Sequence, residues 1–254
     1  MLDSAARHEL TVRFRKARRD PGLTVVEGFH ALKHALRFGA EVREAVAVDP
    51  DAVAALAREL APDVEVELRA RLEPVDAGTL AALVPLPPRT GVVAIARRPA
   101  VDLAATLADP RPAPVILLEQ PRNMGNIGAC VRVAAAGDAA ALLTTGENDP
   151  WYPAAVRGAA GLHFALPVTV VEALPPSDRP LLAIDPEGED LRPGELPPRA
   201  VLAFGTERHG LSAALLERAD ARVAIPMRAG VSSLNLATSV AVTLFSLRIG
   251  PGAG

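Results

Sequence analysis

The sequence predicts an α/β protein built on a mostly parallel sheet. Half of its 254 residues are hydrophobic but only 3% are aromatic, a mixture that packs helices against a sheet without large rings. In the C-terminal half, short β-type runs alternate with helical or Gly/Pro-rich stretches, as parallel strands joined by crossovers do. These runs are VILLEQ, AALLTTG, FALPVTVV, LLAIDP, AVLAFG and ARVAIP.

A change in composition divides the chain. Residues 24–48 read as strand, helix and strand, and the apolar run GVVAIA from Gly91 completes a small α/β domain. Prolines at positions 99, 110, 112 and 114 then mark a stiff connector. We therefore predict an N-terminal domain over residues 1–98, a linker over 99–113 and a second domain over 114–254.

The bulk composition excludes several classes of protein. Cys130 is the only cysteine, so no internal disulfide can form, and no CxxC or His/Cys cluster offers a zinc site. No run of about 18 apolar residues is present, and the N-terminus is charged rather than signal-like. We expect a cytoplasmic protein that uses no membrane and no metal.

Charge is unevenly distributed along the chain. The formal net charge of -3 argues against a uniformly basic, nucleic-acid-coating surface. The segment RFRKARR, however, carries five cations and no anion, which suits a phosphate-binding patch and equally a solvated helix face. These cations are Arg13, Arg15, Lys16, Arg18 and Arg19.

The first candidate for a functional segment runs from a predicted strand into a predicted helix. It is PRNMGNIGACVRVAAAG, residues 121–137. Gly125 and Gly128 allow the backbone to come close to a ligand, and the helix start offers unpaired N–H groups. An ordinary tight connection is the alternative. The GxGxxG spacing of a dinucleotide site is missing, which makes an NAD-linked oxidoreductase a remote choice.

Two further segments combine a strand end with glycines and polar residues. In LAFGTERHGLS, residues 202–212, Glu207 follows a strand whose carboxyl end is where ligands collect; Ser212 as a helix N-cap is the alternative reading. In IPMRAGVSSLNLATSVAVTLF, residues 225–245, a helix is expected to begin near Ser233 to Asn235, with Ser232 or Ser233 as its cap.

In this order and spacing, the three segments resemble the three motifs of the SpoU-type, or TrmH-like, ribose methyltransferases of the SPOUT superfamily. The resemblance covers the whole second domain, where Pro153, Arg157 and Gly161 also fit the family pattern. The first domain is similar to the small RNA-binding domain of L7Ae/L30e type. That second resemblance depends on Glu27-Gly28 followed by an amphipathic helix.

The resemblance implies a trefoil knot in the C-terminal sheet, helices on both faces of that sheet, and a homodimer with its active site at the subunit interface. It also implies S-adenosylmethionine as the methyl donor. The implied catalytic residues are Asn126, Arg132, Glu207, Ser233 and Asn235. The implied cofactor-binding residues are Thr145, Gly205, Ile225, Met227 and Leu234, and the implied RNA-binding residues are the five cations of residues 13–19 together with Arg122.

We therefore expect methylation of the 2′-hydroxyl of a ribose in structured RNA, ribosomal rather than transfer RNA. Arg132 would be the base in the family's usual proposal, but a guanidinium stays protonated, so we favour a role in clamping phosphate and orienting the hydroxyl. Alternatives are a non-catalytic RNA-binding or ribosome-assembly factor of the same fold, methylation of tRNA or of a base, and antibiotic-resistance methylation.

Overall fold

The structure is a computed structural model that describes residues 3–206 and 209–249. The chain divides into two compact units. The first comprises Met1–Ala100 and Trp151–Ala165, and the second comprises Val101–Pro150 and Leu166–Gly254. The domain predicted over 114–254 is therefore interrupted, because Trp151–Ala165 packs with the N-terminal residues.

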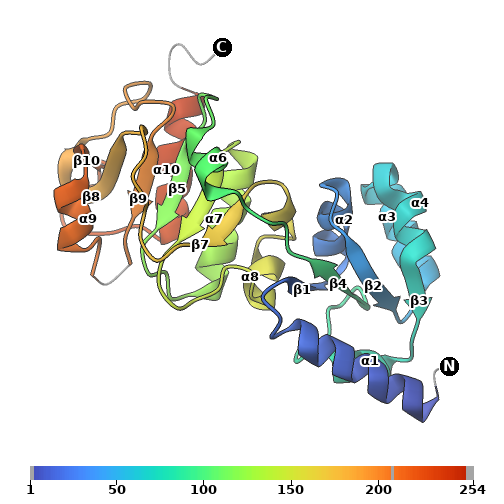
Figure 1. The fold of residues 1–254 in the computed structure, drawn as a ribbon. Helices are drawn as coiled ribbons and strands as arrows, with labels where there is room; N and C mark the ends of the chain where they lie inside the picture. The colour runs from blue at the N-terminus through green and yellow to red at the C-terminus, as the bar shows by residue number, and fades with distance from the viewer. Residues whose placement is uncertain (1–2, 207–208, 250–254) are drawn as a thin grey trace. The chain divides into compact units, whose positions relative to one another are not determined.

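A four-stranded mixed sheet, in the order β1-β4-β2-β3, forms the centre of the first unit (Figure 1). Strand β4 is antiparallel to β1 and β2, and β3 is parallel to β2. The strands are β1 (Leu23–Glu27), β2 (Val42–Ala47), β3 (Leu72–Pro74) and β4 (Val92–Arg97). The helices are α1 (Ser4–Ala17), α2 (Phe29–Arg37), α3 (Pro50–Leu60), α4 (Glu65–Arg71), α5 (Ala77–Leu83) and α8 (Pro153–Gly158), with short 3₁₀ helices at Pro62–Val64 and Leu162–Phe164. The strand, helix and strand expected over residues 24–48 are confirmed.

A buried carboxylate fastens Trp151–Ala165 within the first unit. The Glu27 side chain accepts hydrogen bonds from Arg18, the C-cap of α1, at 2.7 Å and from Arg157 of α8 at 2.6 Å. The Thr24 hydroxyl also donates to the Trp151 carbonyl at 3.0 Å. A buried charge needs such partners, and both arginines are thereby engaged in the structure of this unit.

The second unit contains a six-stranded sheet in the order β10-β8-β9-β5-β6-β7, in which every pair of neighbours is parallel. Its strands are β5 (Val115–Leu118), β6 (Ala141–Thr144), β7 (Val168–Val170), β8 (Leu181–Asp190), β9 (Val201–Phe204) and β10 (Ala221–Ala224). Its helices are α6 (Leu103–Ala108), α7 (Met124–Ala136), α9 (Ala213–Arg218) and α10 (Leu236–Arg248). The predicted parallel α/β class is confirmed.

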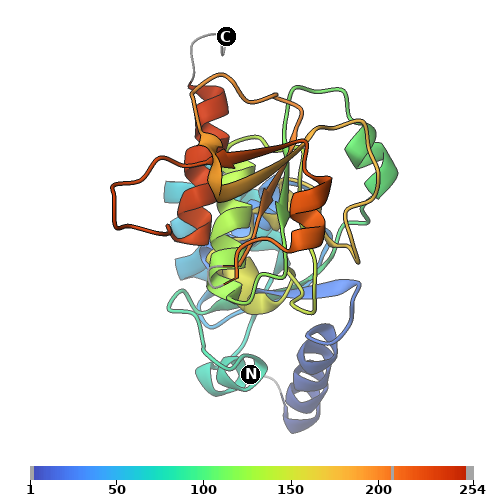
Figure 2. The same cartoon turned by 90° about the vertical axis from the view of Figure 1, so that its left-hand side faces the viewer.

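Helices cover both faces of this parallel sheet. Figure 2 shows α7 and α10 on one face and α6 and α9 on the other. Alternate strand residues such as Val115 and Leu117 pack with Leu107 of α6 and Leu215 of α9, so the residues between them point to the α7–α10 face. Because both faces are covered, β5, β6 and β9 are fully buried apolar runs.

The predicted linker is more ordered than a stiff connector, because it contains α6, which Asp102 caps. Its second half is held by Arg179, which is 4% exposed and donates to the carbonyls of Leu107 and Ala113 at 2.8 Å and of Asp109 at 2.9 Å. Burial lowers the pKa of Arg179, and the charge of Arg199 adds to this effect. Arg199 shares two of these acceptors, donating to the carbonyls of Asp109 at 2.8 Å and Leu107 at 3.1 Å, so Arg179 serves chiefly the buried Ala113 carbonyl and reinforces the other two.

We predict that Arg179→Met lowers the free energy of unfolding by about 3 kcal/mol, because it removes three hydrogen bonds to the linker and leaves the buried Ala113 carbonyl without this donor. Urea unfolding measures the change. Arg192→Met is the matched control: this exposed arginine has only a 3.8 Å ion pair to Glu195 and should change stability by less than about 0.5 kcal/mol. Equal effects of the two substitutions would contradict the role assigned to Arg179.

Candidate cofactor pocket

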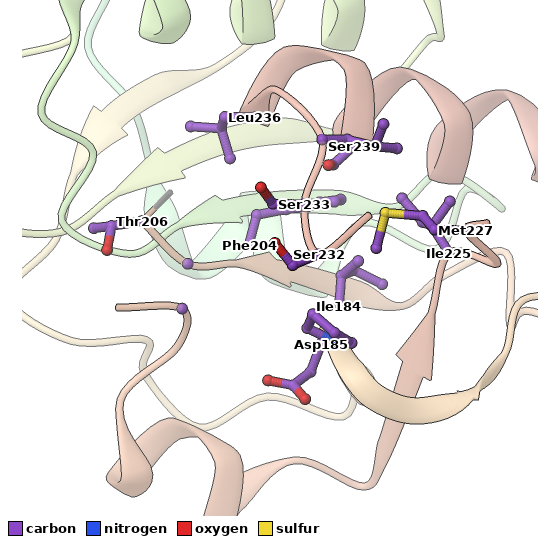
Figure 3. Close-up of a pocket in the computed structure, with 14 residues that line it drawn as sticks. Ile184, Asp185, Phe204, Thr206, Ile225, Met227, Ser232, Ser233, Leu236 and Ser239 are labelled. Atoms are coloured by element: carbon purple, nitrogen blue, oxygen red, sulfur yellow. The ribbon is translucent and has the colours of Figure 1, made fainter. Parts of the chain in front are cut away.

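A pocket of about 350 Å³ lies beyond the carboxyl ends of β9 and β10 and against the middle of β8. Figure 3 shows side chains from these strands and from the segment leading into α10 around it. Its size lies in the range of about 300 to 1,000 Å³ usual for small-molecule sites. The described lining residues are Ile184, Asp185, Pro186, Phe204, Gly205, Thr206, Gly210, Ile225, Met227, Ser232, Ser233, Leu234, Leu236 and Ser239.

The loop after β9 can form only with glycine at position 205. A Cβ atom added to Gly205 would lie 2.0 Å from the carbonyl carbon of Gly210 and 2.3 Å from the nitrogen of Leu211. The loop folds back on itself here, with Thr206 and Gly210 exchanging backbone hydrogen bonds of 3.1 and 3.0 Å. This close approach places backbone polar groups at the pocket, as expected of a residue predicted to bind the cofactor.

Asn235 controls where the loop after β10 ends and α10 begins. Its side-chain oxygen accepts from the backbone N–H groups of Ala237 at 2.9 Å and Thr238 at 3.4 Å. The predicted cap at Ser232 or Ser233 is therefore wrong, since the helix starts later. Both serines instead are exposed residues that line the pocket.

A hydrogen bond joins the first and third motifs. The Asn235 side-chain amide donates to Asn126 Oδ1 at 3.1 Å. Asn126 lies in the first turn of α7, which Asn123 caps by accepting from the Asn126 backbone N–H at 3.0 Å. Residues 109 positions apart are thus brought together at the starts of two neighbouring helices.

The predicted residues Arg132, Glu207 and Thr145 are not among the described residues that line this pocket. Arg132 is exposed on α7, and within residues 3–206 and 209–249 it has neither a hydrogen bond nor an ion pair. Glu207 lies outside the described residues.

Thr145, predicted to bind the cofactor, is not among the described residues of this pocket. It lines a second hollow beside Glu119, where its hydroxyl accepts from the Gln120 backbone N–H at 3.0 Å.

The basic segment of α1 is partly engaged in internal ion pairs. Arg13 bonds both oxygens of Glu44, at 2.9 and 2.7 Å, and this contact raises the pKa of Arg13. Arg18 is held by buried Glu27. Arg15, Lys16 and Arg19 are exposed, as is Arg122 beside the first motif, so these four side chains remain accessible to a phosphate backbone.

Asp185 is a pocket residue that sequence reasoning missed. It follows the buried part of β8 directly, in the run LLAIDP that we used only to predict a strand. The turn-forming sequence Asp-Pro-Glu-Gly directly after an apolar run was the available signal.

Within the described part of the chain, no helix has both the length and the apolar character needed to cross a membrane. The same residues contain no group of three or more His, Cys, Asp or Glu side chains placed to hold a metal ion.

The fold and the pocket define a class of protein: a parallel α/β domain arranged to bind a small organic ligand beyond the carboxyl ends of its strands. Comparison with known proteins makes this specific. The chain belongs to the SpoU rRNA methylase family, whose model matches residues 113–245, slightly more than half of the chain. The resemblance inferred from the three segments is confirmed.

Similarity to individual proteins extends over both units. The SpoU methyltransferase AviRb of Streptomyces viridochromogenes, solved in complex with AdoMet, is 26% identical with a TM-score of 0.74, and the match covers 96% of this chain and 97% of AviRb. The 23S rRNA (guanosine(2553)-2′-O)-methyltransferase RlmP of Bacillus subtilis is 28% identical over 92% of each chain. An uncharacterized tRNA/rRNA methyltransferase of Mycobacterium bovis is 35% identical over 64% of this chain, and the match spans only 62% of that relative.

We predict that Asn235→Ala lowers the free energy of unfolding by about 1 kcal/mol, because α10 loses its cap. Asn235→Asp keeps the accepting oxygen and should retain most of this stability while removing the N–H donor to Asn126. Thermal or urea unfolding of both variants separates the two roles. If Asn235→Ala were as stable as the unsubstituted protein, the cap would contribute nothing to α10.

Proposed function

We propose that this protein transfers the methyl group of S-adenosylmethionine to the 2′-hydroxyl of a ribose in ribosomal RNA. The observation that carries the proposal is the pocket formed by the second and third motifs, with Asn235 joining that pocket to the first motif. Family membership supports the activity, and AviRb with its bound AdoMet supports the cofactor.

The described residues fit such a cofactor. Apolar side chains from Phe204, Ile225 and Leu236 offer a surface for an adenine ring, and the hydroxyls of Thr206, Ser232, Ser233 and Ser239 offer partners for polar groups. The backbone drawn together at Gly205 supplies further donors and acceptors. We assign cofactor binding to Gly205, Ile225, Met227 and Leu234, which line this pocket; Thr145 lines the second hollow.

S-adenosylmethionine, when bound, supplies a methyl group on a sulfonium centre. The chain's task is to hold the ribose hydroxyl in line with that methyl group, because orientation can recover roughly 7 to 11 kcal/mol of a barrier. Arg132 presents an exposed guanidinium on α7, the helix that begins at the first motif. Since a guanidinium stays protonated, we assign Arg132 to clamping an RNA phosphate and orienting the hydroxyl.

RNA as the substrate agrees with the chemistry and with the charge distribution. Only RNA carries the 2′-hydroxyl, and Arg15 and Lys16 of α1 and Arg19 just after it are exposed cations suited to phosphate contacts. We propose that the N-terminal unit is the RNA-binding module, of L7Ae/L30e type. RlmP, which matches 92% of this chain, is named for methylating 23S rRNA, and this supports ribosomal RNA over transfer RNA.

We further propose a homodimer built on α7 and α10, with a trefoil knot behind the pocket. Four residues spaced four, three and four apart, three on α10 and one just after it, are half-exposed or exposed: Thr238, Val242, Phe245 and Ile249. Val242 is 40% and Ile249 79% exposed in the single chain. In a two-fold dimer the same surface patch of both subunits meets, and these exposed apolar side chains could form such a patch. The knot is supported by the path of the chain, which returns from edge strand β10, past the pocket loops, to pack α10 on α7.

The proposed activity predicts transfer of radiolabelled methyl groups from S-adenosylmethionine to ribosomal RNA and none to DNA of the same sequence. Arg132→Lys should lower turnover by about 100-fold, because an ammonium cannot reproduce the planar fork. Arg192→Lys, an exposed arginine outside the described pocket lining, is the control. Cofactor binding without any methyl transfer would favour a non-catalytic assembly factor, and full activity of Arg132→Lys would refute the clamp.

The dimer predicts that Val242→Asp converts the protein to a monomer, since it places a charge beside the apolar side chains of Phe245 and Ile249. Sedimentation velocity measures the mass. Val66→Asp is the control, because Val66 is a 77% exposed residue of α4 in the first unit. A purified protein that is monomeric before substitution would contradict the dimer.

A further inference from the structure

One side chain in the pocket carries a charge that none of the three motifs accounts for. Among the described residues that line the pocket, Asp185 alone is ionisable. It is half-buried, and within residues 3–206 and 209–249 it forms no ion pair. A partly buried carboxylate without a cation is costly unless a ligand supplies the opposite charge.

The sheet is interrupted in a way that brings Asp185 to the pocket. Along the β8–β10 ladder, the register moves from Ala183 opposite Arg222 directly to Glu189 opposite Val223, so residues 184–188 bulge out of the pairing. On the other side of β8, the pairing with β9 continues as far as Ile184 opposite Phe204. Figure 3 shows Asp185 on this curved segment at the edge of the pocket.

Two local features fix the bulge. A Cβ atom added to Gly188 would lie 2.5 Å from backbone atoms of both Arg222 and Val223, so the base of the bulge is pressed against β10 and accepts only glycine. At its tip, Asp185 Oδ1 accepts from the Glu187 backbone N–H at 2.9 Å, which is an Asx turn. One carboxylate oxygen is thereby committed to the turn, while the second remains available to a ligand.

We propose that Asp185 binds the α-ammonium group of the methionine moiety of S-adenosylmethionine; this inference rests on the proposed function. The ammonium group carries a full charge and N–H donors, which form strong hydrogen bonds with a carboxylate. The sulfonium centre carries charge but no donor, and the ribose hydroxyls carry donors but no charge. The ammonium group alone satisfies both the charge and the hydrogen-bonding capacity of Asp185.

Calorimetric titration of the full-length protein with three ligands tests this assignment. Asp185→Asn removes the charge and keeps the oxygen that accepts from Glu187, so the turn is preserved. The variant should bind S-adenosylmethionine and S-adenosylhomocysteine about 10-fold more weakly, because both carry the ammonium group. Its affinity for 5′-methylthioadenosine, which lacks the amino-acid portion, should be unchanged.

Glu187→Gln is the matched control, because Glu187 is exposed, two residues away and not among the described pocket residues; it should bind all three ligands normally. Equal weakening for all three ligands in Asp185→Asn would place the contact on the adenosine portion and overturn the proposal. Unchanged binding of all three would overturn it as well. If the unsubstituted protein bound no S-adenosylmethionine, the proposed function itself would fail, and this inference with it.

Discussion

The architecture of the site depends on one constraint, the parallel orientation of all six strands of the second unit. Because β8, β9 and β10 run in the same direction, the segments that follow them open at a single edge of the sheet. The backbone contact of Gly205 with Gly210 then draws one of these segments tight enough to leave a pocket. If β8 ran antiparallel to its two neighbours, its segment would face away from those of β9 and β10, and the three could not line one cavity.

Asn235 connects this pocket to the rest of the domain. One side chain ends the loop, begins α10 and hydrogen-bonds Asn126 at the start of α7. A polar residue serves these roles better than an apolar one because each of its side-chain atoms has a defined partner. The first and third motifs are thereby joined by a direct side-chain contact, which suits a reaction that depends on orientation.

Local patterns were sufficient to predict much of the fold, but not the contacts between distant residues. The apolar runs of β5, β6 and β9, and the position of Gly205 at a strand end, follow from sequence periodicity and from turn chemistry. The attachment of Arg157 to Glu27, 130 residues apart, leaves no local signal, and neither does the engagement of Arg18 within a basic run. The cap of α10 was misplaced because three capping residues occur close together, and only the geometry selects Asn235.

Amide hydrogen exchange with and without S-adenosylmethionine tests most directly whether the loops beyond β8, β9 and β10 form one cofactor site. We expect slower exchange in residues 184–186, 205–206, 209–211 and 225–236 when the cofactor is present, and no change in residues 13–19 at the end of α1 and just after it. Protection confined to other segments, or affecting only one of these three loops, would contradict it.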